Sequence, residues 1–199
     1  MPTDQPARRR RDPQKRIKEI IAATEQVIAE RGIEGLTHRA VAEKAGVPLG
    51  ATTYHFATKD DLITAALQRA VDRYAAYLED WAARRPGLTA DQLTVLLTDV
   101  LLDCFGPQRD QQVLEFELYL AALRRPTLRP VADRYIQLTI DTLAHYTDPV
   151  TATTAAVAIT GLTLRGLAGT QTPTRTEIET CLRRLLAPLP SAPPHDSRV

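Results

Sequence analysis

Proline and glycine divide this chain into segments, and each segment repeats its apolar residues at the spacing of an α-helix. The segment between Pro13 and Gly32 carries one apolar stripe, which consists of Ile17, Ile20, Ile21, Thr24, Val27 and Ile28. A stripe that recurs about every 3.6 residues buries one side of a helix. No stretch alternates polar and apolar residues between Asn-Gly or Asp-Gly turns, as a hairpin would. The sequence therefore predicts an all-α fold of about nine helices.

The breaks between these segments predict where the helices begin and end. Three helices are expected within residues 13–56, and a fourth runs from Lys59 to about Arg84. Five more are expected over residues 89–105, 108–125, 127–146, 150–168 and 174–186. Both ends of the chain are polar, contain proline and lack periodicity, which is typical of disorder. We therefore expect a disordered basic arm over 1–12, a small helical domain over 13–58, a larger one over 59–187 and a disordered tail over 188–199.

Basic residues gather near the N-terminus, although the net charge of the whole chain is only +1. Residues 8–18 contain one acid, Asp12, against seven bases: Arg8, Arg9, Arg10, Arg11, Lys15, Arg16 and Lys18. A local excess of this kind favours an anionic partner. Two interpretations of the run 8–11 stay open: an arm laid in a DNA minor groove, or a solvated tail.

Residues 37–56 have the pattern of a helix-turn-helix. Thr37 is a good N-cap for a short helix that buries Ala40 and Val41, and Gly46 permits a tight turn. A second short helix follows from Pro48 to about His55 and presents small and polar side chains outward. Such a helix fits the major groove of DNA, where base edges can be distinguished. The pattern alone also fits an ordinary pair of helices in a bundle.

The stretch 32–62 resembles the DNA-binding domain of TetR-family transcriptional regulators. The resemblance rests on Leu36-Thr37, Val41-Ala42, Ala45-Gly46-Val47, Gly50, Tyr54, Phe56, Lys59 and Leu62. It is strong over about residues 13–67 and weaker beyond, where residues 117–126 are similar to a segment of the family's ligand domains. It implies a helix-turn-helix DNA-binding domain followed by a helical domain for ligand binding and dimerisation. The implied function is a repressor released from its operator by a small molecule. The alternative is a regulator without such an inducer, controlled by a protein or constitutive.

The resemblance also implies which residues contact double-stranded DNA. The candidates are Thr37, His38, Arg39, Pro48, Leu49, Gly50, Ala51, Thr52, Thr53, Tyr54, His55 and Lys59. Hydroxyl groups and the Lys59 ammonium would bind phosphates, and Gly50 would let the backbone approach the DNA closely. Family members commonly have an aromatic residue three positions before Phe56, but here that position is Thr53 and the aromatic is Tyr54. Which of these two contacts phosphate stays open.

Dimerisation is expected because one short recognition helix reads few bases, so such proteins pair on a pseudo-palindromic operator. Residues 150–170 are dense in small residues, and Gly161 and Gly166 suggest a close contact between helices. The resemblance implies a homodimer through about residues 150–187. The alternative explanation of the glycines is a tight contact within one chain.

The middle helices are expected to hold an unknown small-molecule effector. The candidate pocket residues are Tyr74, Tyr77, Trp81, Phe105, Phe116, Glu117, Tyr119 and Tyr135. Glu115 and Glu117 lie within an apolar run, so one of them could bind a cationic ligand. We favour instead the simpler expectation that Arg124, Arg125 or Arg134 neutralises them.

The sequence contains no pattern of an enzyme, a metal site or a cofactor site. The four histidines form no H-E-x-x-H motif, and no G-x-S-x-G or P-loop spacing occurs. Cys104 and Cys181 lie far apart and outside any metal-ligand spacing. We find no apolar run of membrane-spanning length and no signal peptide. We therefore expect a cytoplasmic protein that is not an enzyme and has no membrane partner.

Overall fold

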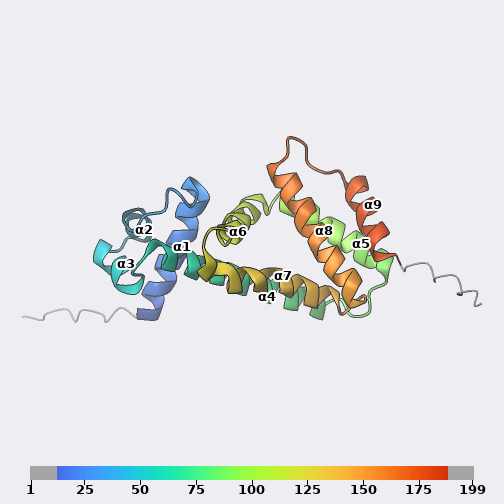
Figure 1. Cartoon of the computed structure of the whole chain (residues 1–199), viewed down its shortest axis with the longest axis horizontal. Helices are drawn as coiled ribbons and strands as arrows, with labels where there is room; N and C mark the ends of the chain where they lie inside the picture. The colour runs from blue at the N-terminus through green and yellow to red at the C-terminus, as the bar shows by residue number, and fades with distance from the viewer. Residues whose placement is uncertain (1–12, 188–199) are drawn as a thin grey trace, which may run out of the picture. The chain divides into compact units, whose positions relative to one another are not determined.

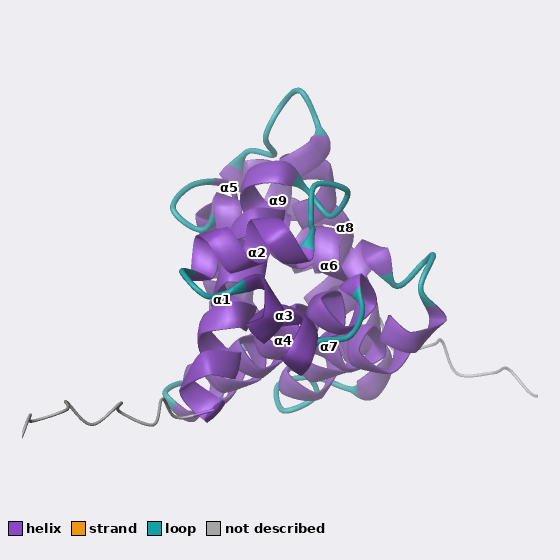
Figure 2. Ribbon diagram, turned by 90° about the vertical axis from the view of Figure 1, so that its left-hand side faces the viewer, coloured by secondary structure: helices purple, strands orange, loops and turns teal. Residues whose placement is uncertain are grey.

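The computed structural model describes residues 13–187, and over these residues the chain is helical without any strand (Figures 1 and 2). The elements are α1 Pro13–Arg31, α2 His38–Ala45, α3 Leu49–His55, α4 Lys59–Ala83, α5 Ala90–Phe105, α6 Arg109–Ala121, the 3-10 turn η1 Pro126–Leu128, α7 Arg129–Leu143, α8 Pro149–Ala168 and α9 Arg175–Leu186. This confirms the all-α prediction and its nine helices. The expected arm and tail lie outside the described residues.

The described residues form two compact units. The first unit contains residues 13–76 and 110–135, and the second contains residues 77–109 and 136–187. Helices α4, α6 and α7 each cross from one unit to the other. This division by packing does not follow the expected boundary at residue 58, because most of α6 and the first half of α7 pack with the N-terminal helices.

Side-chain caps fix the ends of the helices around the predicted helix-turn-helix. The Thr37 hydroxyl oxygen accepts the Ala40 N–H at 3.1 Å and caps α2, as expected. Gly46 ends α2 in the left-handed conformation, with φ at 62°, which glycine adopts without strain. Thr58 and Asp61 cap α4 reciprocally, since Thr58 Oγ1 accepts the Asp61 N–H and Asp61 Oδ2 accepts the Thr58 N–H. The turn between α2 and α3 is therefore set by local sequence.

The first unit has an aliphatic core that includes Ile20, Val27 and Ile28 of α1 and Leu62, Ile63 and Leu67 of α4. Burying each such side chain fully contributes about 1.5–3 kcal/mol. One carboxylate, Glu25 of α1, lies in this apolar setting with 8% of its surface exposed. Arg73 and Arg69 of α4 both bind it, at 2.6 Å and 3.5 Å. Charge as well as apolar contact therefore holds α1 against α4.

The second unit is built on α5, α8 and α9, which pack against one another (Figure 1). Its buried residues include Trp81, Leu93, Leu97, Leu101, Leu143, Ala152, Ala155, Ala156, Ile178 and Leu182. The alanines of α8 let a neighbouring helix approach closely. Gly166 has a similar role, because a Cβ there would lie 2.3 Å from Phe105 Cε1 of the same chain. Phe105 of the same chain therefore explains Gly166, as the alternative of a tight contact within one chain expected.

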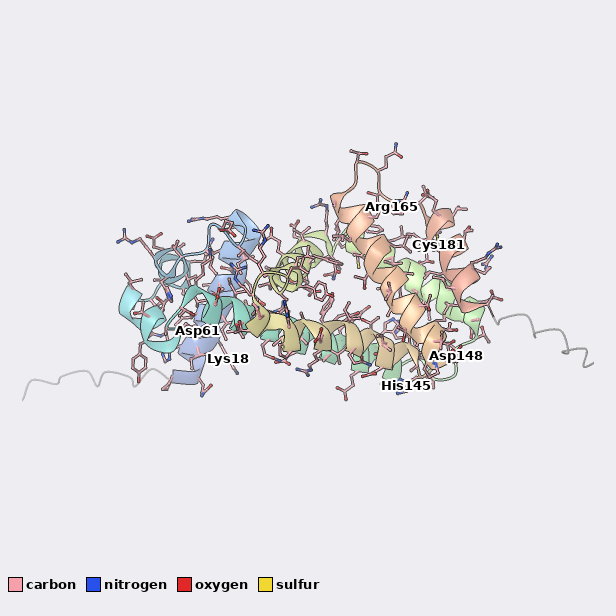
Figure 3. All side chains as sticks on the ribbon, in the orientation of Figure 1. Lys18, Asp61, His145, Asp148, Arg165 and Cys181 are labelled. Atoms are coloured by element: carbon pink, nitrogen blue, oxygen red, sulfur yellow. The ribbon has the colours of Figure 1, made fainter. Side chains whose placement is uncertain are left out.

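Among the described residues, helix α8 is long and apolar enough to cross a membrane by length and composition alone, a test that the core helix of a soluble protein also passes. Four threonine hydroxyls of α8 each donate a hydrogen bond to the backbone carbonyl four residues earlier, which satisfies these polar groups within the helix. They belong to Thr153, Thr154, Thr160 and Thr163. Only 22% of its apolar window is buried within the chain. Arg165, labelled in Figure 3, lies in its last turn and is exposed. The helix thus presents an apolar side that the described residues leave uncovered.

Candidate functional site

Helix α3 packs on α2 through its inner side, and Thr52 lies on that side. Thr52 has no exposed surface, and its hydroxyl donates to the Leu49 carbonyl at 2.8 Å. A side chain in this position cannot reach DNA while α3 stays folded. The prediction that Thr52 contacts DNA is therefore wrong, and its small size serves the packing of the two helices.

The outer side of α3 is strongly exposed. Tyr54 exposes 84% of its surface and Leu49 exposes 45%, and Gly50 and Thr53 are exposed beside them. Neither Thr53 nor Tyr54 points inward, because Thr52 takes that position. The other candidates with exposed surface are Thr37, Arg39 and Pro48, and the partly exposed ones are His38, Ala51, His55 and Lys59. One continuous segment, from Thr37 to Lys59, therefore supplies all the remaining DNA candidates.

The fold of the chain does not require a glycine at position 50. A Cβ at this position would meet no atom within 4 Å, and its φ is not positive. Glycine inside a helix costs roughly 0.5–1 kcal/mol relative to alanine. Since neither packing nor backbone conformation needs the glycine, a partner outside the chain that approaches closely would explain it.

A hollow of about 600 Å³, open to solvent, lies beside α3. It is lined by Pro13 and Arg16 of α1 and by Gly50, Ala51, Tyr54 and His55 of α3. Arg16 was not among the predicted site residues, although it belongs to the basic run that favoured an anionic partner. The sequence could not place it beside α3, because that proximity depends on how α1 packs.

Lys59 begins α4 and makes no ion pair with any described residue. The backbone N–H groups of Thr58 and Asp61 are engaged by the Thr58–Asp61 cap, and the hydrogen bonds with Thr58 hold the pKa of Asp61 below its usual value. Asp61 and Lys18 are labelled in Figure 3. At this end of α4, the Lys59 ammonium is therefore a positive charge that no ion pair with a described residue neutralises.

Glu115 of α6 is buried, with 6% of its surface exposed, and it has only neutral hydrogen-bond donors. Gln111 and Gln112 donate to it through Nε2 at 2.7 and 3.2 Å, and the Tyr135 hydroxyl donates at 3.2 Å. Burial raises the pKa of Glu115 above its ordinary value, against these hydrogen bonds and the charge of Arg73. Both carboxylate oxygens of Glu115 thus accept hydrogen bonds, but no ion pair with a described residue neutralises the carboxylate.

The expected neutralisation by arginine is wrong for two of the three candidates. Arg125 binds Asp60 at 2.9 Å, and Arg134 binds Asp72 at 2.9 Å. Both acids lie on α4, so these arginines attach the α6–α7 connection and α7 to that helix. No ion pair joins Arg124 to Glu115 among the described residues.

Three of the predicted pocket aromatics meet beside Glu115 in the first unit. Tyr74 and Tyr135 stack with their ring centroids 4.7 Å apart, and Tyr119 lies 5.9 Å from Tyr135. Phe116 is buried in the same unit. The remaining aromatics, Tyr77, Trp81 and Phe105, belong to the second unit. We call Glu115, Gln111, Tyr74, Tyr119 and Tyr135 the tyrosine–carboxylate cluster.

Glu117 lies away from this cluster, although it was a predicted pocket residue. Its Oε1 would lie 3.9 Å from a Cβ at Gly32, and the backbone N–H of Ile33 donates to its carboxylate. Its other oxygen is buried without a hydrogen-bond partner. Glu117 thus contacts the loop between α1 and α2, and Glu115, which the list of candidates omitted, faces the tyrosines.

The raised pKa of Glu115 predicts how stability depends on pH. The folded protein holds the proton more tightly than the unfolded chain, whose glutamate pKa is about 4.3. The stability that protonation contributes is present below that value and is lost as pH rises through the folded pKa. Glu115→Gln cannot ionise, so its free energy of unfolding should rise relative to the native chain between pH 4 and pH 7. Each pKa unit corresponds to about 1.4 kcal/mol. Urea titrations across this range measure the difference, and a constant difference would contradict the argument.

No group of three or more histidine, cysteine, aspartate or glutamate side chains within residues 13–187 could hold a metal ion. Most of the predicted site residues gather in two places, while Tyr77, Trp81 and Phe105 belong to the second unit and Glu117 contacts the loop between α1 and α2. One is the exposed side of the helix-turn-helix, and the other is the tyrosine–carboxylate cluster.

Comparisons with known proteins agree on both halves of the chain. Residues 20–66 match a family described as bacterial regulatory proteins, tetR family, and residues 88–188 match the tetracyclin repressor-like C-terminal domain. The HTH-type transcriptional regulator PksA of Bacillus subtilis (strain 168) is 34% identical over 110 residues. That alignment covers 55% of this chain and about half, 51%, of the relative.

Solved structures resemble the chain over most of its length. The multidrug binding protein EbrR complexed with imidazole is 41% identical over 96% of this chain and 100% of its own, with a TM-score of 0.76. EbrR complexed with ethidium is 42% identical over 85% of this chain and 98% of its own, with a TM-score of 0.75. Further EbrR structures hold proflavin and malachite green. A TetR-family member of Streptomyces coelicolor A3, SCO1917, is 42% identical over 86% of this chain and 98% of its own, with a TM-score of 0.72.

Proposed function

The chain belongs to the TetR family of DNA-binding transcriptional regulators, and from this premise we propose that it is a homodimeric repressor that a cationic aromatic molecule releases from its operator. The observation that carries the proposal is Glu115, a buried carboxylate with neutral donors and stacked tyrosines around it. As a regulator of transcription it would act in the cytoplasm and carry out no chemistry of its own.

The DNA contacts that we propose come from the outer side of the helix-turn-helix. Leu49, Gly50, Thr53 and Tyr54 of α3 would enter the major groove, where base edges specify the sequence. Arg16, Arg39 and Lys59 would bind phosphates and fix the register. The remaining contributors are Thr37, His38, Pro48, Ala51 and His55, which border this surface.

The dimer contact that we propose is the uncovered side of α8. Val150, Val157 and Leu164 expose 74%, 61% and 38% of their surfaces, and Gly161 lies between them with open space around its Cβ position. Their spacing places all four on one side of the helix. Exposed apolar residues gathered in this way are typical of a protein–protein contact, and a second copy of α8 is the partner that fits a two-fold operator.

The effector that we propose is an aromatic cation bound at the tyrosine–carboxylate cluster. A buried carboxylate without a cationic partner gains most from a ligand that brings positive charge, and tyrosine faces attract cations and planar rings. EbrR, which is similar over nearly its whole length, has been solved with ethidium, proflavin and malachite green, which are aromatic cations. These two independent lines support the same ligand class.

Ethidium binding tests the proposal directly. The native chain should enhance ethidium fluorescence on titration, and Glu115→Gln should weaken binding by about thirtyfold or more, since removing one partner of a buried charge pair costs about 2–5 kcal/mol. Glu117→Gln is the matched control, because it changes a carboxylate two residues away that faces the α1–α2 loop. The ethidium affinity of Glu117→Gln should stay within about threefold of the native value.

Operator affinity is measured in the same series, and the operator is a DNA fragment selected by binding to the native protein. Saturating ethidium should release the fragment from the native chain. If ethidium, proflavin and malachite green all fail to bind, the proposed effector class is wrong. If no small cation changes operator affinity, the regulator without an inducer becomes the better description.

A further inference from the structure

An ion pair joins the first turn of α4 to the connection between α6 and α7. Arg125 Nε lies 2.9 Å from Asp60 Oδ1, although 65 residues separate the two in the sequence. The Arg125 side chain exposes 20% of its surface and the Asp60 side chain exposes 55%. Both residues belong to the first unit. The pair therefore fixes two segments of this unit that the order of the chain does not bring together.

The first turn of α4, which contains Asp60, controls where α3 lies. Only residues 56–58 connect α3 to α4. Phe56 of this connection is buried, and Thr58 is held by its reciprocal cap with Asp61. Because the connection is short and anchored at both of these residues, α3 follows a movement of the first turn of α4.

Arg125 lies in the middle of the connection between two helices of the tyrosine–carboxylate cluster. Residues 122–128 connect α6, which carries Tyr119, to α7, which carries Tyr135. The ring centroids of these two tyrosines are 5.9 Å apart. A flat ring between them needs about 7 Å, because it makes two contacts of about 3.5 Å each. An aromatic ligand that enters between these rings therefore separates α6 from α7 and displaces the connection that carries Arg125.

We propose that Arg125 is the positioning residue that holds the first turn of α4, and with it α3, in the orientation that the operator requires. The ligand-dependent part rests on the proposed function, in which an aromatic cation binds at the cluster. Such a ligand moves Arg125 relative to Asp60, α3 loses its orientation, and the operator is released. The pair is partly exposed to water, so its loss changes the stability of the fold little. The DNA affinity should therefore respond while the chain stays folded.

Arg134 offers a matched control, because its ion pair also attaches the α6–α7 region to α4. Arg134 Nη1 lies 2.9 Å from Asp72 Oδ1, the same distance as in the pair of Arg125. Asp72 lies 12 residues after Asp60, or about 18 Å further along α4. Arg134→Gln therefore removes the same charge and the same kind of contact, but at a point far from α3.

The first experiment needs no ligand and compares affinity for the operator with affinity for a shuffled fragment of the same length. A change in net charge alters both affinities, whereas a misoriented α3 lowers only the specific one. Arg125→Gln should lower the ratio of specific to shuffled affinity about tenfold, since the proposed dimer carries the pair twice and each loss contributes about threefold. Arg134→Gln should leave the ratio within about twofold. An unchanged ratio in Arg125→Gln, or an equal fall in both variants, would overturn the proposal.

Exchanging the two charges tests whether the contact itself matters. Arg125→Asp brings two acids together and Asp60→Arg brings two bases together, so each alone should lower the ratio about tenfold or more. Asp60→Arg should do so although its added positive charge tightens binding to shuffled DNA. The double variant restores an opposite pair and should return the ratio to within about threefold of the native value. A ratio that stays low in the double variant would contradict the proposal.

The second experiment adds ethidium at saturation, with ethidium binding and operator release measured separately. Arg125→Gln should still bind ethidium, but ethidium should raise its operator Kd at least about threefold less than in the native chain. An undiminished effect would overturn the proposed displacement. If the native chain does not bind ethidium, the proposed effector class fails, and the ligand-free series still decides the role of Arg125. Should Arg125→Asp not fold, Asp60→Ala removes the same contact and should also lower the ratio, and an unchanged ratio would refute the proposal.

Discussion

Replacing Gly161 with leucine is expected to convert the proposed dimer to a monomer and to weaken operator binding by about a hundredfold or more. The substitution places a branched side chain where two copies of α8 would approach most closely. The single chain has open space there, so the monomer should fold as before and gain helical stability from the loss of a glycine. A monomer reads one half-site and loses the gain from two linked contacts, which is about 10² to 10⁴ in affinity.

Light scattering measures the mass, and anisotropy with the selected operator measures the affinity. Gly161→Ala is the graded control, because one methyl group raises helix propensity equally well and should leave most of the dimer intact. Gln137→Leu, an exposed position on α7, controls for an added surface leucine. A Gly161→Leu protein that remains dimeric would exclude this side of α8 as the interface.

The helices and many of their ends could be predicted because their signals are local, although α6 ends at Ala121 rather than near residue 125 and α7 spans Arg129–Leu143 rather than 127–146. Thr37, Gly46 and the Thr58–Asp61 pair act within four residues of their partners, so the sequence contains both members of each contact. Pro13 and Pro149 likewise stand at the first position of α1 and α8. The two short helices and their turn follow from these short-range signals, whereas their assignment as a DNA-binding helix-turn-helix rested on the resemblance to the TetR family.

The direction of individual side chains could not be predicted in the same way. Successive residues of a helix point about 100° apart, so an uncertainty of one residue in α3 exchanges a buried position for an exposed one. Thr52 and Thr53 are chemically identical, yet only the first is buried. Gly161 and Gly166 point about 140° apart on α8, and only the second packs against Phe105.

The partners of Glu115 were also beyond local reasoning. Two arginines that follow it in the sequence, Arg124 and Arg125, suggested neutralisation, but Arg125 binds Asp60, 65 residues away. The tyrosines that surround Glu115 come from three helices. Which acid a given arginine binds depends on tertiary packing, and several arginines near several acids make many pairings compatible with one sequence.

Substitution of Gly50 with leucine is expected to weaken operator binding by about a hundredfold, equivalent to about 2.7 kcal/mol, while the free protein becomes no less stable. The reason is that Gly50 has empty space around it in the free chain and would face the DNA at close range in the complex. Adding a side chain therefore costs nothing before binding and creates a collision on binding. Thermal unfolding and operator anisotropy, measured on the same samples, separate the two effects.

Two further variants make the result specific to the outer side of α3. Gly50→Ala should raise the unfolding temperature, because a helical glycine is removed, yet weaken operator binding by a smaller factor than leucine does. Thr52→Val replaces a side chain on the buried side of α3 with one of the same shape. It should leave operator affinity within about twofold of the native value. An affinity that falls with Thr52→Val but not with Gly50→Leu would mean that α3 presents its other side to DNA. Affinity and stability that fall together in Gly50→Leu would mean that the glycine serves the fold, and the proposed close approach of DNA would have to be abandoned.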